Sequence, residues 1–455
     1  GPGGADPAGA ESELLRLESM NPEAAEQSIG QGSAADVYLQ RRGLIFVDGR
    51  PLRQVRNYWQ LWREAGTFWV EADGLTVHLR LDDDGDPRQH SLEYTAREQV
   101  FAPRQRYLGY IRIKGLCFER VGNGFPMPQC AAVSTNCGHH WIIEDNTICW
   151  INAIGLDIGH GDWNRVNNEA ASGWHIVRRN AFSHCGFNGL CGIGAGQDRK
   201  LEGVLVSDNA FEHCVWHAAD AILETASIKL HHVRNSLICR NSVRHQPNGL
   251  GAIWIDYENV NTRVCHNLVR NCRVQYGGIF FEASHAPNEI VGNLVCDISR
   301  PQGKSLGGAG IYVLNSDPIL VKGNAVLRCA GPAIRLHISS PGRVTEGRGS
   351  TGYHQHVTDN VISHCRVAVH LARSQAHCEG NIYGSFVEPA PFRIDEPQEY
   401  LDLAAWQEFH RWDLEGMQAE IESDTDVEAH AILVRVRGDH GMETIAYPLD
   451  GYGPE

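Results

Sequence analysis

The sequence lacks any apolar stretch approaching the roughly 18–20 residues that a membrane-spanning helix needs. Its start also lacks the basic and then apolar pattern of a secretion signal. We therefore expect no membrane partner. The opening letters GPGG are typical of a cloning scar, so an export signal could have been removed and the compartment stays open.

Positive charge is also scarce, because 40 Lys and Arg residues stand against 55 Asp and Glu residues, for a formal net charge of −15. Such a surface repels nucleic-acid backbones and anionic membranes, so we expect neither as a partner and favour a neutral or cationic ligand. Long amphipathic helices are lacking too. The 48 glycines instead suit many short strands joined by turns.

Metal-ligand spacings are scarce as well: no CxxC pattern occurs among the fourteen cysteines. The sequence therefore predicts no metal cluster and no cofactor. Disulfides remain an alternative for the cysteines, but scattered thiols more often serve as small buried core residues.

Composition divides the chain into four parts. These are, in chain order, a mobile tail (1–35), a small antiparallel β segment (36–105), a large body (106–394) and a C-terminal cap (395–455). Within the cap, the spacing of apolar residues predicts a helix over 399–421, and AILVRVRG predicts a strand over 431–438.

A short motif recurs through the body: two variable residues, Asn, one more residue, and usually an aliphatic residue. Its Asn residues are Asn146, Asn180, Asn209, Asn241, Asn267, Asn293, Asn324, Asn360 and Asn381. Helix-pair solenoids keep a steadier period than these spacings, which range from 21 to 36 residues. A variable period of short strands predicts an all-β fold, a parallel β-helix whose loops can vary in length without disturbing its coils.

The repeated Asn has a physical role in such a fold. It suits a tight turn with a left-handed backbone, and its amide can bond to the Asn of the next coil. Five cysteines follow their Asn by five residues and should stack in one buried line; they are Cys185, Cys214, Cys272, Cys329 and Cys365.

Three acids share one position of the repeat, because Glu224, Asp256 and Glu282 each follow an Asn by fifteen residues. Adjacent coils lie about 4.7–4.9 Å apart, so these carboxyl groups should repel one another and raise one pKa. Retaining glycosidases use two carboxyl groups about 5–5.5 Å apart. The predicted spacing matches that geometry, although a solvated acidic face would show the same column.

Strand alternation indicates which way the acids point. In AIWID and GIFFE, residues such as Ile253 and Phe281 should face the core, which leaves Asp256 and Glu282 on the solvent face of one sheet.

Aromatic and imidazole side chains near these acids could wall a sugar site and bond its hydroxyl groups. The candidates are Trp254, Tyr257, Trp216, His285, His139 and His140, with Glu224 as a further substrate-binding acid. A single His in such a place is more often a satisfied turn residue.

The stretch IWID…NTRVCHNLVRN…IFFEASHAP…IVGNLV resembles the right-handed parallel β-helix enzymes of glycoside hydrolase family 120, the β-xylosidases. The resemblance covers roughly residues 106–390, and its specific part is 252–295. It implies Asp256 as nucleophile and Glu282 as acid/base. Tyr257 and Ala286 depart from the family pattern, which puts the identity of the sugar in doubt more than the type of reaction.

Three functions follow as expectations. The first is a retaining exo-glycosidase acting on neutral, xylose-like oligosaccharides or aryl and alkyl glycosides, with a homo-oligomer left open. The second is a polysaccharide lyase or epimerase, which needs a cation beside the uronate; the strands look poor in Lys and Arg, with only Arg263 close. The third is a carbohydrate-binding solenoid without catalysis.

Overall fold

The computed structural model describes residues 43–71, 74–123, 129–160, 172–195, 199–216, 225–301, 307–339, 343–345, 347–426, 431–438 and 441–448. The tail predicted for residues 1–35 lies outside these ranges.

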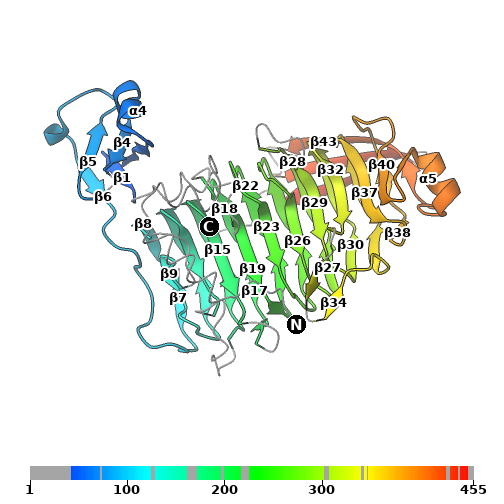
Figure 1. Cartoon of the computed structure of the whole chain (residues 1–455), viewed down its shortest axis with the longest axis horizontal. Coiled ribbons are helices and arrows are strands. Elements are labelled where there is room, and N and C mark those ends of the chain that lie inside the picture. Colours follow the sequence, from blue (N-terminus) through cyan, green and yellow to red (C-terminus); the bar gives the residue numbers. More distant parts are fainter. Residues whose placement is uncertain are drawn as a thin grey trace.

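The body is a solenoid of three long sheets whose strands follow one another around each coil (Figure 1). The first sheet contains β7 (Arg112–Lys114), β10 (Ile142–Glu144), β13 (Ile176–Arg178), β17 (Leu205–Ser207), β21 (Leu237–Cys239), β24 (Arg263–Cys265), β27 (Asn288–Val291), β30 (Ile319–Lys322), β35 (Gln355–Thr358) and β38 (His377–Glu379). The second contains β8 (Cys117–Val121), β11 (Thr147–Ile151), β14 (Ala181–Cys185), β18 (Ala210–Glu212), β22 (Ser242–Arg244), β25 (Leu268–Arg270), β28 (Leu294–Ile298), β31 (Ala325–Cys329), β36 (Val361–Ser363), β39 (Ile382–Tyr383) and β42 (Met417–Gln418).

The third sheet faces the viewer in Figure 1 and carries the predicted acids. It contains β9 (Val133–Ser134), β12 (Ile154–Asp157), β15 (Asn188–Ile193), β19 (Ala226–His231), β23 (Gly251–Asp256), β26 (Gly277–Glu282), β29 (Ala309–Leu314), β32 (Pro332–His337), β37 (Val367–Arg373), β40 (Phe392–Glu396) and β41 (Glu399–Leu401). Its strands pair in parallel until β41, which returns antiparallel to β40. The predicted all-β parallel β-helix is confirmed.

The Asn repeat forms the predicted ladder at the turn between the first and second sheets. From Asn146 to Asn381, each side-chain N–H donates to the next Asn oxygen at 2.9–3.0 Å, and Asn381 donates to Asp413 at 2.7 Å. The left-handed residue is the one before each Asn, such as Asp145 (φ 56°) or Gly292 (φ 65°). Our expectation that the Asn itself takes this conformation was wrong: it closes the turn through its side chain.

The cysteine column is also confirmed. Cys185, Cys214, Cys272, Cys329 and Cys365 are buried in the main core among Ile, Val and Phe side chains. Ile298 pairs with Cys329 in register, so an aliphatic residue replaces the thiol in one coil. All fourteen cysteines are free thiols.

A small module precedes the solenoid and contains the predicted antiparallel pairs. Its elements are β1 (Ile45–Val47), β2 (Arg50–Pro51), β3 (Arg53–Gln54), α4 (Tyr58–Arg63), β4 (Thr67–Val70), β5 (Val77–Arg80), the 3-10 turn η1 (Pro87–Gln89) and β6 (Leu92–Tyr94). Helix α4, which we did not expect, begins where Asn57 accepts from the Gln60 N–H at 3.0 Å. A contact of Arg120 with Glu93 and the packing of Phe46 on Trp150 join the module to the first coils.

The C-terminal part caps the solenoid with a shorter helix than predicted. Helix α5 (Leu403–His410) begins at Asp402 and buries Trp406 against Phe392, which closes the end of the core. It ends at Arg411 in a left-handed conformation, so the predicted helix over 399–421 was too long.

The chain then returns along the side of the solenoid. Strands β43 (Glu420–Asp426), β44 (Ala431–Gly438) and β45 (Gly441–Pro448) form an antiparallel sheet whose Val434 and Val436 pack over Leu294 and Leu327 of the second sheet. This sheet confirms the predicted strand over 431–438, but it covers a flank rather than the end. Among the described residues, no helix is long and apolar enough to span a membrane.

Candidate active site

The two predicted acids lie side by side on the third sheet. Asp256 on β23 and Glu282 on β26 are direct partners in the parallel register. Their neighbours Ile255 and Phe281 point into the main core, as strand alternation predicts. Adjacent parallel strands are about 4.8 Å apart, so the two acids leave the outer face of the sheet from backbone positions at about that separation.

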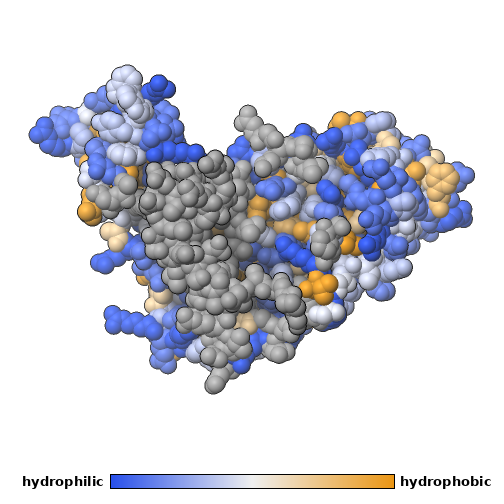
Figure 2. Space-filling view, in the orientation of Figure 1, coloured by the Kyte–Doolittle hydropathy of each residue, from blue (hydrophilic) through white to orange (hydrophobic). Residues whose placement is uncertain are grey.

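The acids are not open to solvent, contrary to our expectation. Asp256 is 6% exposed and Glu282 is 4% exposed. Part of this cover is a hairpin of β33 (Val344–Thr345) and β34 (Arg348–Gly349), inserted between β32 and β35, which reaches back two coils. In Figure 2 the rims of this face are mainly hydrophilic, with hydrophobic residues showing between them.

The position beside Asp256 at which we predicted Glu224 holds another residue. The residue opposite Asp256 on the preceding strand is His231. Glu224 itself lies outside the described residues. Counting from the Asn failed here because the coil from Asn209 to Asn241 is 32 residues long, six more than the next, and the added residues precede the strand.

Each acid contacts a cation that sequence reasoning missed. Lys229 on β19 donates to Asp256 Oδ2 at 2.9 Å, and both side chains are buried. Arg343 from the hairpin pairs with Glu282, and the Arg343 side chain is 48% exposed. Arg263 instead belongs to the first sheet, where it pairs with Glu289 at 2.6 Å. The belief that the site is poor in Lys and Arg was therefore wrong.

Two histidines beside Asp256 are held neutral. Burial lowers the pKa of His231 well below its usual value, and the nearby Lys229 ammonium lowers it further. Burial, followed by the proximity of His231, lowers the pKa of His232 to about 2. His231 Nε2 lies 3.6 Å from Asp256 Oδ2, and its ring stacks on Tyr257 with centroids 5.5 Å apart. Tyr257 therefore lies beside His231 and directly follows Asp256 in the chain.

His285 lies in the turn that follows β26. It is buried, and its Nδ1 is 3.4 Å from Glu258 Oε1. Lys200 donates to the Glu258 backbone oxygen at 2.7 Å, and Arg348 donates to the His285 backbone oxygen at 3.2 Å. These contacts fix the turns that follow β23 and β26, so His285 supports the site rather than opening to a ligand.

Trp254 is close to the acids but does not form an open platform. It is buried in an outer apolar cluster with Phe280 and Tyr312, and Lys229 Nζ lies 3.3 Å from the centre of its ring. Tyr276 packs on Phe280, and its pKa is raised by burial and then by the nearby Glu282 carboxylate. Tyr276 is a further residue of the site that the sequence did not single out.

Trp216, His139 and His140 are not part of this cluster. Trp216 packs on Trp150 and donates to the His184 backbone oxygen at 3.0 Å, beyond the end of a second-sheet strand. His140 stacks between Tyr110 and Trp174. The turn that contains His139 and His140 lies four coils before the turn that follows Asp256. The two turns are therefore about 19 Å apart along the axis of the solenoid.

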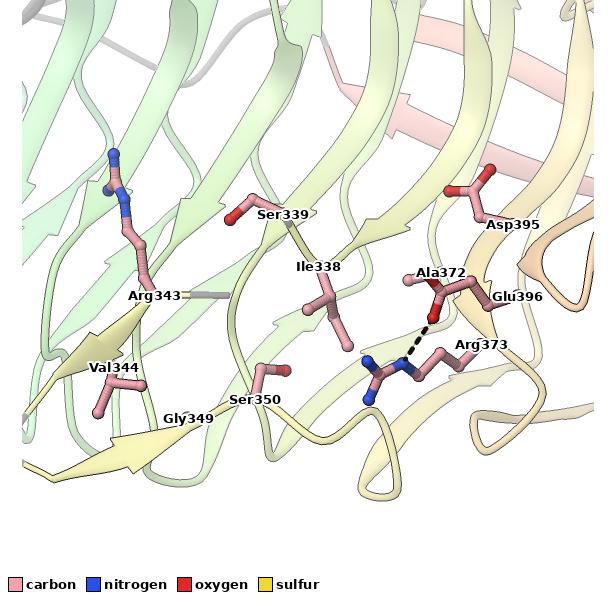
Figure 3. Close-up of a pocket in the computed structure, with 10 residues that line it drawn as sticks. All are labelled: Ile338, Ser339, Arg343, Val344, Gly349, Ser350, Ala372, Arg373, Asp395 and Glu396. Atoms are coloured by element: carbon pink, nitrogen blue, oxygen red, sulfur yellow. Dashed lines mark ion pairs between the residues drawn. The ribbon is translucent and has the colours of Figure 1, made fainter. Parts of the chain in front are cut away.

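A cavity of about 300 Å³ lies beyond the hairpin, on the Glu282 side of the pair. Figure 3 shows its lining, with Ile338 and Ser339 in the middle and Arg343 pointing away from the ion pair of Arg373 with Glu396. That pair is 3.5 Å long. Arg343 therefore contacts Glu282 and also forms one wall of a polar cavity.

Strand alignment could have found some of the missed residues. Aligning IKLHH with IWIDY and IFFEA places Lys229 beside Trp254 and His231 beside Asp256, as the register shows. Arg343 and Arg348 carried no such signal, because their hairpin is an insertion outside the repeat.

Comparison with known proteins supports the architecture. The family described as "Right handed beta helix region" matches residues 131–301, so the fold is a right-handed parallel β-helix. A solved structure described as "The complex structure of XylC with xylose" aligns with a TM-score of 0.55 at 16% identity, covering 87% of this chain and 70% of that chain. At this identity the likeness shows the fold. No curated protein matches the sequence.

Proposed function

We propose that the protein is a retaining exo-glycosidase acting on neutral, xylose-like glycosides, with Asp256 and Glu282 as its two carboxyl groups. The observation that carries this proposal is their direct pairing on adjacent strands. A backbone spacing near 4.8 Å suits the retaining carboxyl separation of about 5–5.5 Å better than the inverting one of about 6.5–9.5 Å.

In this reaction Glu282 gives its proton to the leaving-group oxygen while Asp256 attacks the anomeric carbon. The bond to the leaving group breaks, and a covalent glycosyl ester forms on Asp256. A water molecule then attacks the same carbon, Glu282 takes its proton, and the free sugar leaves with its original configuration.

The cations suit these two roles differently. The Lys229 ammonium, buried with Asp256, is the hydrogen-bond donor that an ionised carboxylate accepts best. Arg343 is half-exposed on a hairpin, so a substrate can displace it from Glu282 without rearranging the sheet. We infer that Arg343 leaves Glu282 when the leaving group enters.

The order of strands suggests where the leaving group lies. Glu282, the proton donor, faces the leaving group, and the strands beyond it on that side are β29, β32, β37 and β40. The cavity behind Arg343 is on this side and is polar enough for a sugar. The burial of Asp256 on the other side agrees with a closed end, hence with exo action.

The test is hydrolysis of aryl xyloside, arabinoside, fucoside, glucoside and galactoside by the wild-type protein and by Asp256→Ala and Glu282→Gln. Xylosides come first because the structural neighbour was solved with xylose. We expect cleavage of one glycoside and its loss, by more than about 1000-fold, in both variants. The matched control is Glu212→Gln, which removes a carboxylate from the second sheet. Equal rates in all proteins, or no cleavage of any glycoside, would contradict the proposal and favour a binding solenoid.

A uronate-processing lyase or epimerase is the second candidate, favoured by the cations that the structure places at the acids. Lys229, Arg343 and Arg348 supply the positive charge that a uronate carboxylate needs. Incubation with polyuronates, followed by ultraviolet detection of unsaturated products and NMR detection of epimerised residues, separates this reaction from glycoside hydrolysis. Either product without any glycosidase activity would replace our first proposal.

A further inference from the structure

Outside the candidate active site, three metal-ligating side chains gather on the outer face of the second sheet. They are Cys117 and Glu119 on β8 and Cys149 on β11. One ligand atom of each, two sulfurs and a carboxylate oxygen, lies within 4.8 Å of the others. No other set of three His, Cys, Asp or Glu side chains in the described part of the chain meets this separation.

The parallel register creates this cluster. Cys149 lies opposite Glu119, and Thr147 lies opposite Cys117, so the two thiols are diagonal neighbours on one face. Phe118 and Ile148, between them, point into the main core. Cys149 and Glu119 are 30 positions apart in the sequence, so no short sequence motif could show the grouping.

The atoms match the preferences of a thiophilic divalent cation. Zn²⁺ takes thiolate sulfur at about 2.3 Å and carboxylate oxygen at about 2.0–2.2 Å in tetrahedral geometry, so three protein ligands leave one position for water. Small side-chain rotations would bring ligand atoms within 4.8 Å to these bonds.

A carboxylate stands beside the two thiols. Cys149 Sγ lies 3.9 Å from Glu119 Oε2, and Arg120 Nε lies 3.9 Å from the other carboxylate oxygen of Glu119. A bound divalent cation is attracted by the carboxylate and stabilises thiolates.

The position of the site within the fold indicates a stabilising role. Among the described residues, strand β8 is the terminal strand of the second sheet and pairs only with β11. The next residues, Arg120 and Trp150, contact the N-terminal module through Glu93 and Phe46. Terminal coils of a solenoid lack a neighbour on one side and need extra stabilisation.

We propose that Cys117, Glu119 and Cys149 bind one Zn²⁺ or a similar thiophilic divalent cation, with water as the fourth ligand. The metal clips the first coil of the solenoid to the second, beside the N-terminal module. As it binds, the two thiols release their protons to solvent, so affinity rises with pH.

The test is a Cd²⁺ titration of the reduced, metal-free whole chain, followed by the thiolate-to-metal absorption in the ultraviolet. We expect saturation at one equivalent. Cys117→Ser and Cys149→Ser should each weaken Cd²⁺ binding by more than about 100-fold, which is more than the loss expected when a residue that only supports a ligand is changed. Glu119→Gln should weaken it by about tenfold.

Two control variants are matched to this design. Cys265→Ser removes one thiol from the in-register pair Cys239 and Cys265, and Glu212→Gln removes an acid further along the outer face that carries Glu119 and Cys149. Both should bind Cd²⁺ like the wild type. Equal binding by the site variants would mean an adventitious ion only, and would overturn the proposal.

A second readout does not depend on absorption. Zn²⁺ should raise the melting temperature of the wild type and leave that of Cys149→Ser unchanged, because only the folded site binds the metal. A Zn²⁺-independent melting temperature in the wild type, or a Cys117–Cys149 disulfide that persists in reductant, would overturn the proposal.

Discussion

Two columns of polar side chains run in register along the solenoid, and they solve the same stacking problem in different ways. Each Asn of the ladder offers its neighbour both a donor and an acceptor, so one residue type repeats from Asn146 to Asn381 without charge. Asp256 and Glu282 offer only acceptors when ionised and repel each other. In the described part of their column, only these two acids are direct neighbours, and each is paired with a cation from another strand or loop. The neutral Asn column stabilises the fold along its length, whereas the two neighbouring acids require cations from other segments to offset their repulsion.

The largest effect should come from removing a cation from the charged column. Lys229→Met leaves Asp256 buried without its ammonium, which should lower the free energy of unfolding by about 3–5 kcal/mol. Urea denaturation measures this change. The double variant Lys229→Met/Asp256→Asn should recover most of it, because no unpaired charge remains. A double variant as unstable as the single one would show that packing, not charge, makes Lys229 necessary.

The exposed pair of Lys322 with Asp359 is the matched control for that experiment. Its side chains are 50% and 55% exposed at a separation of 3.2 Å. Lys322→Met should change the free energy of unfolding by less than about 1 kcal/mol, because solvent screens the pair.

A smaller effect should follow from breaking the neutral column. Asn267→Ala removes the acceptor for the Asn241 side chain and the donor to Asn293, at 3.0 Å each. Burying the unmatched groups should lower the free energy of unfolding by about 2–3 kcal/mol. Asn261→Gly, which removes an exposed bond to Asn235 and suits the left-handed backbone at this position (φ 48°), should change it by about 0.5 kcal/mol or less. Equal losses in the two variants would contradict the structural role of the ladder.

The smallest effect concerns pH. The folded pKa of His232 is lowered to about 2, so between that value and the ordinary 6.5 the unfolded chain binds more protons than the folded one. Stability should therefore fall as pH drops below 6.5, with up to about 1.4 kcal/mol per pH unit from this one group. His232→Asn should flatten that dependence. An unchanged slope in urea denaturation between pH 5 and 6.5 would contradict the lowered pKa.

The repeat is visible in the sequence, and it was sufficient to predict most of the solenoid. The Asn ladder, the cysteine column and the pairing of Asp256 with Glu282 were predictable because each depends on a fixed offset within a coil. The position before Asp256 in that column, where we predicted Glu224, holds His231 because its coil carries an insertion before the strand. An offset counted from the repeated Asn predicts a strand position only in coils that carry no insertion.

The remainder of the site depends on contacts between segments far apart in sequence. Arg343 reaches Glu282 across 61 residues from a hairpin outside the repeat, and this hairpin also explains part of the burial that we did not predict. The strand over 431–438 was predictable from its own pattern, but its place on the second sheet was not. Local patterns give the elements, and only packing decides which faces they cover.

The most direct test of the two-carboxylate mechanism is azide rescue of Asp256→Ala on whichever aryl glycoside the wild type cleaves. If Asp256 is the nucleophile, azide enters the vacated space, restores turnover and gives a glycosyl azide whose anomeric configuration is opposite to that of the substrate. No rescue, or a variant that cleaves the glycoside at the wild-type rate without azide, would contradict the role assigned to Asp256.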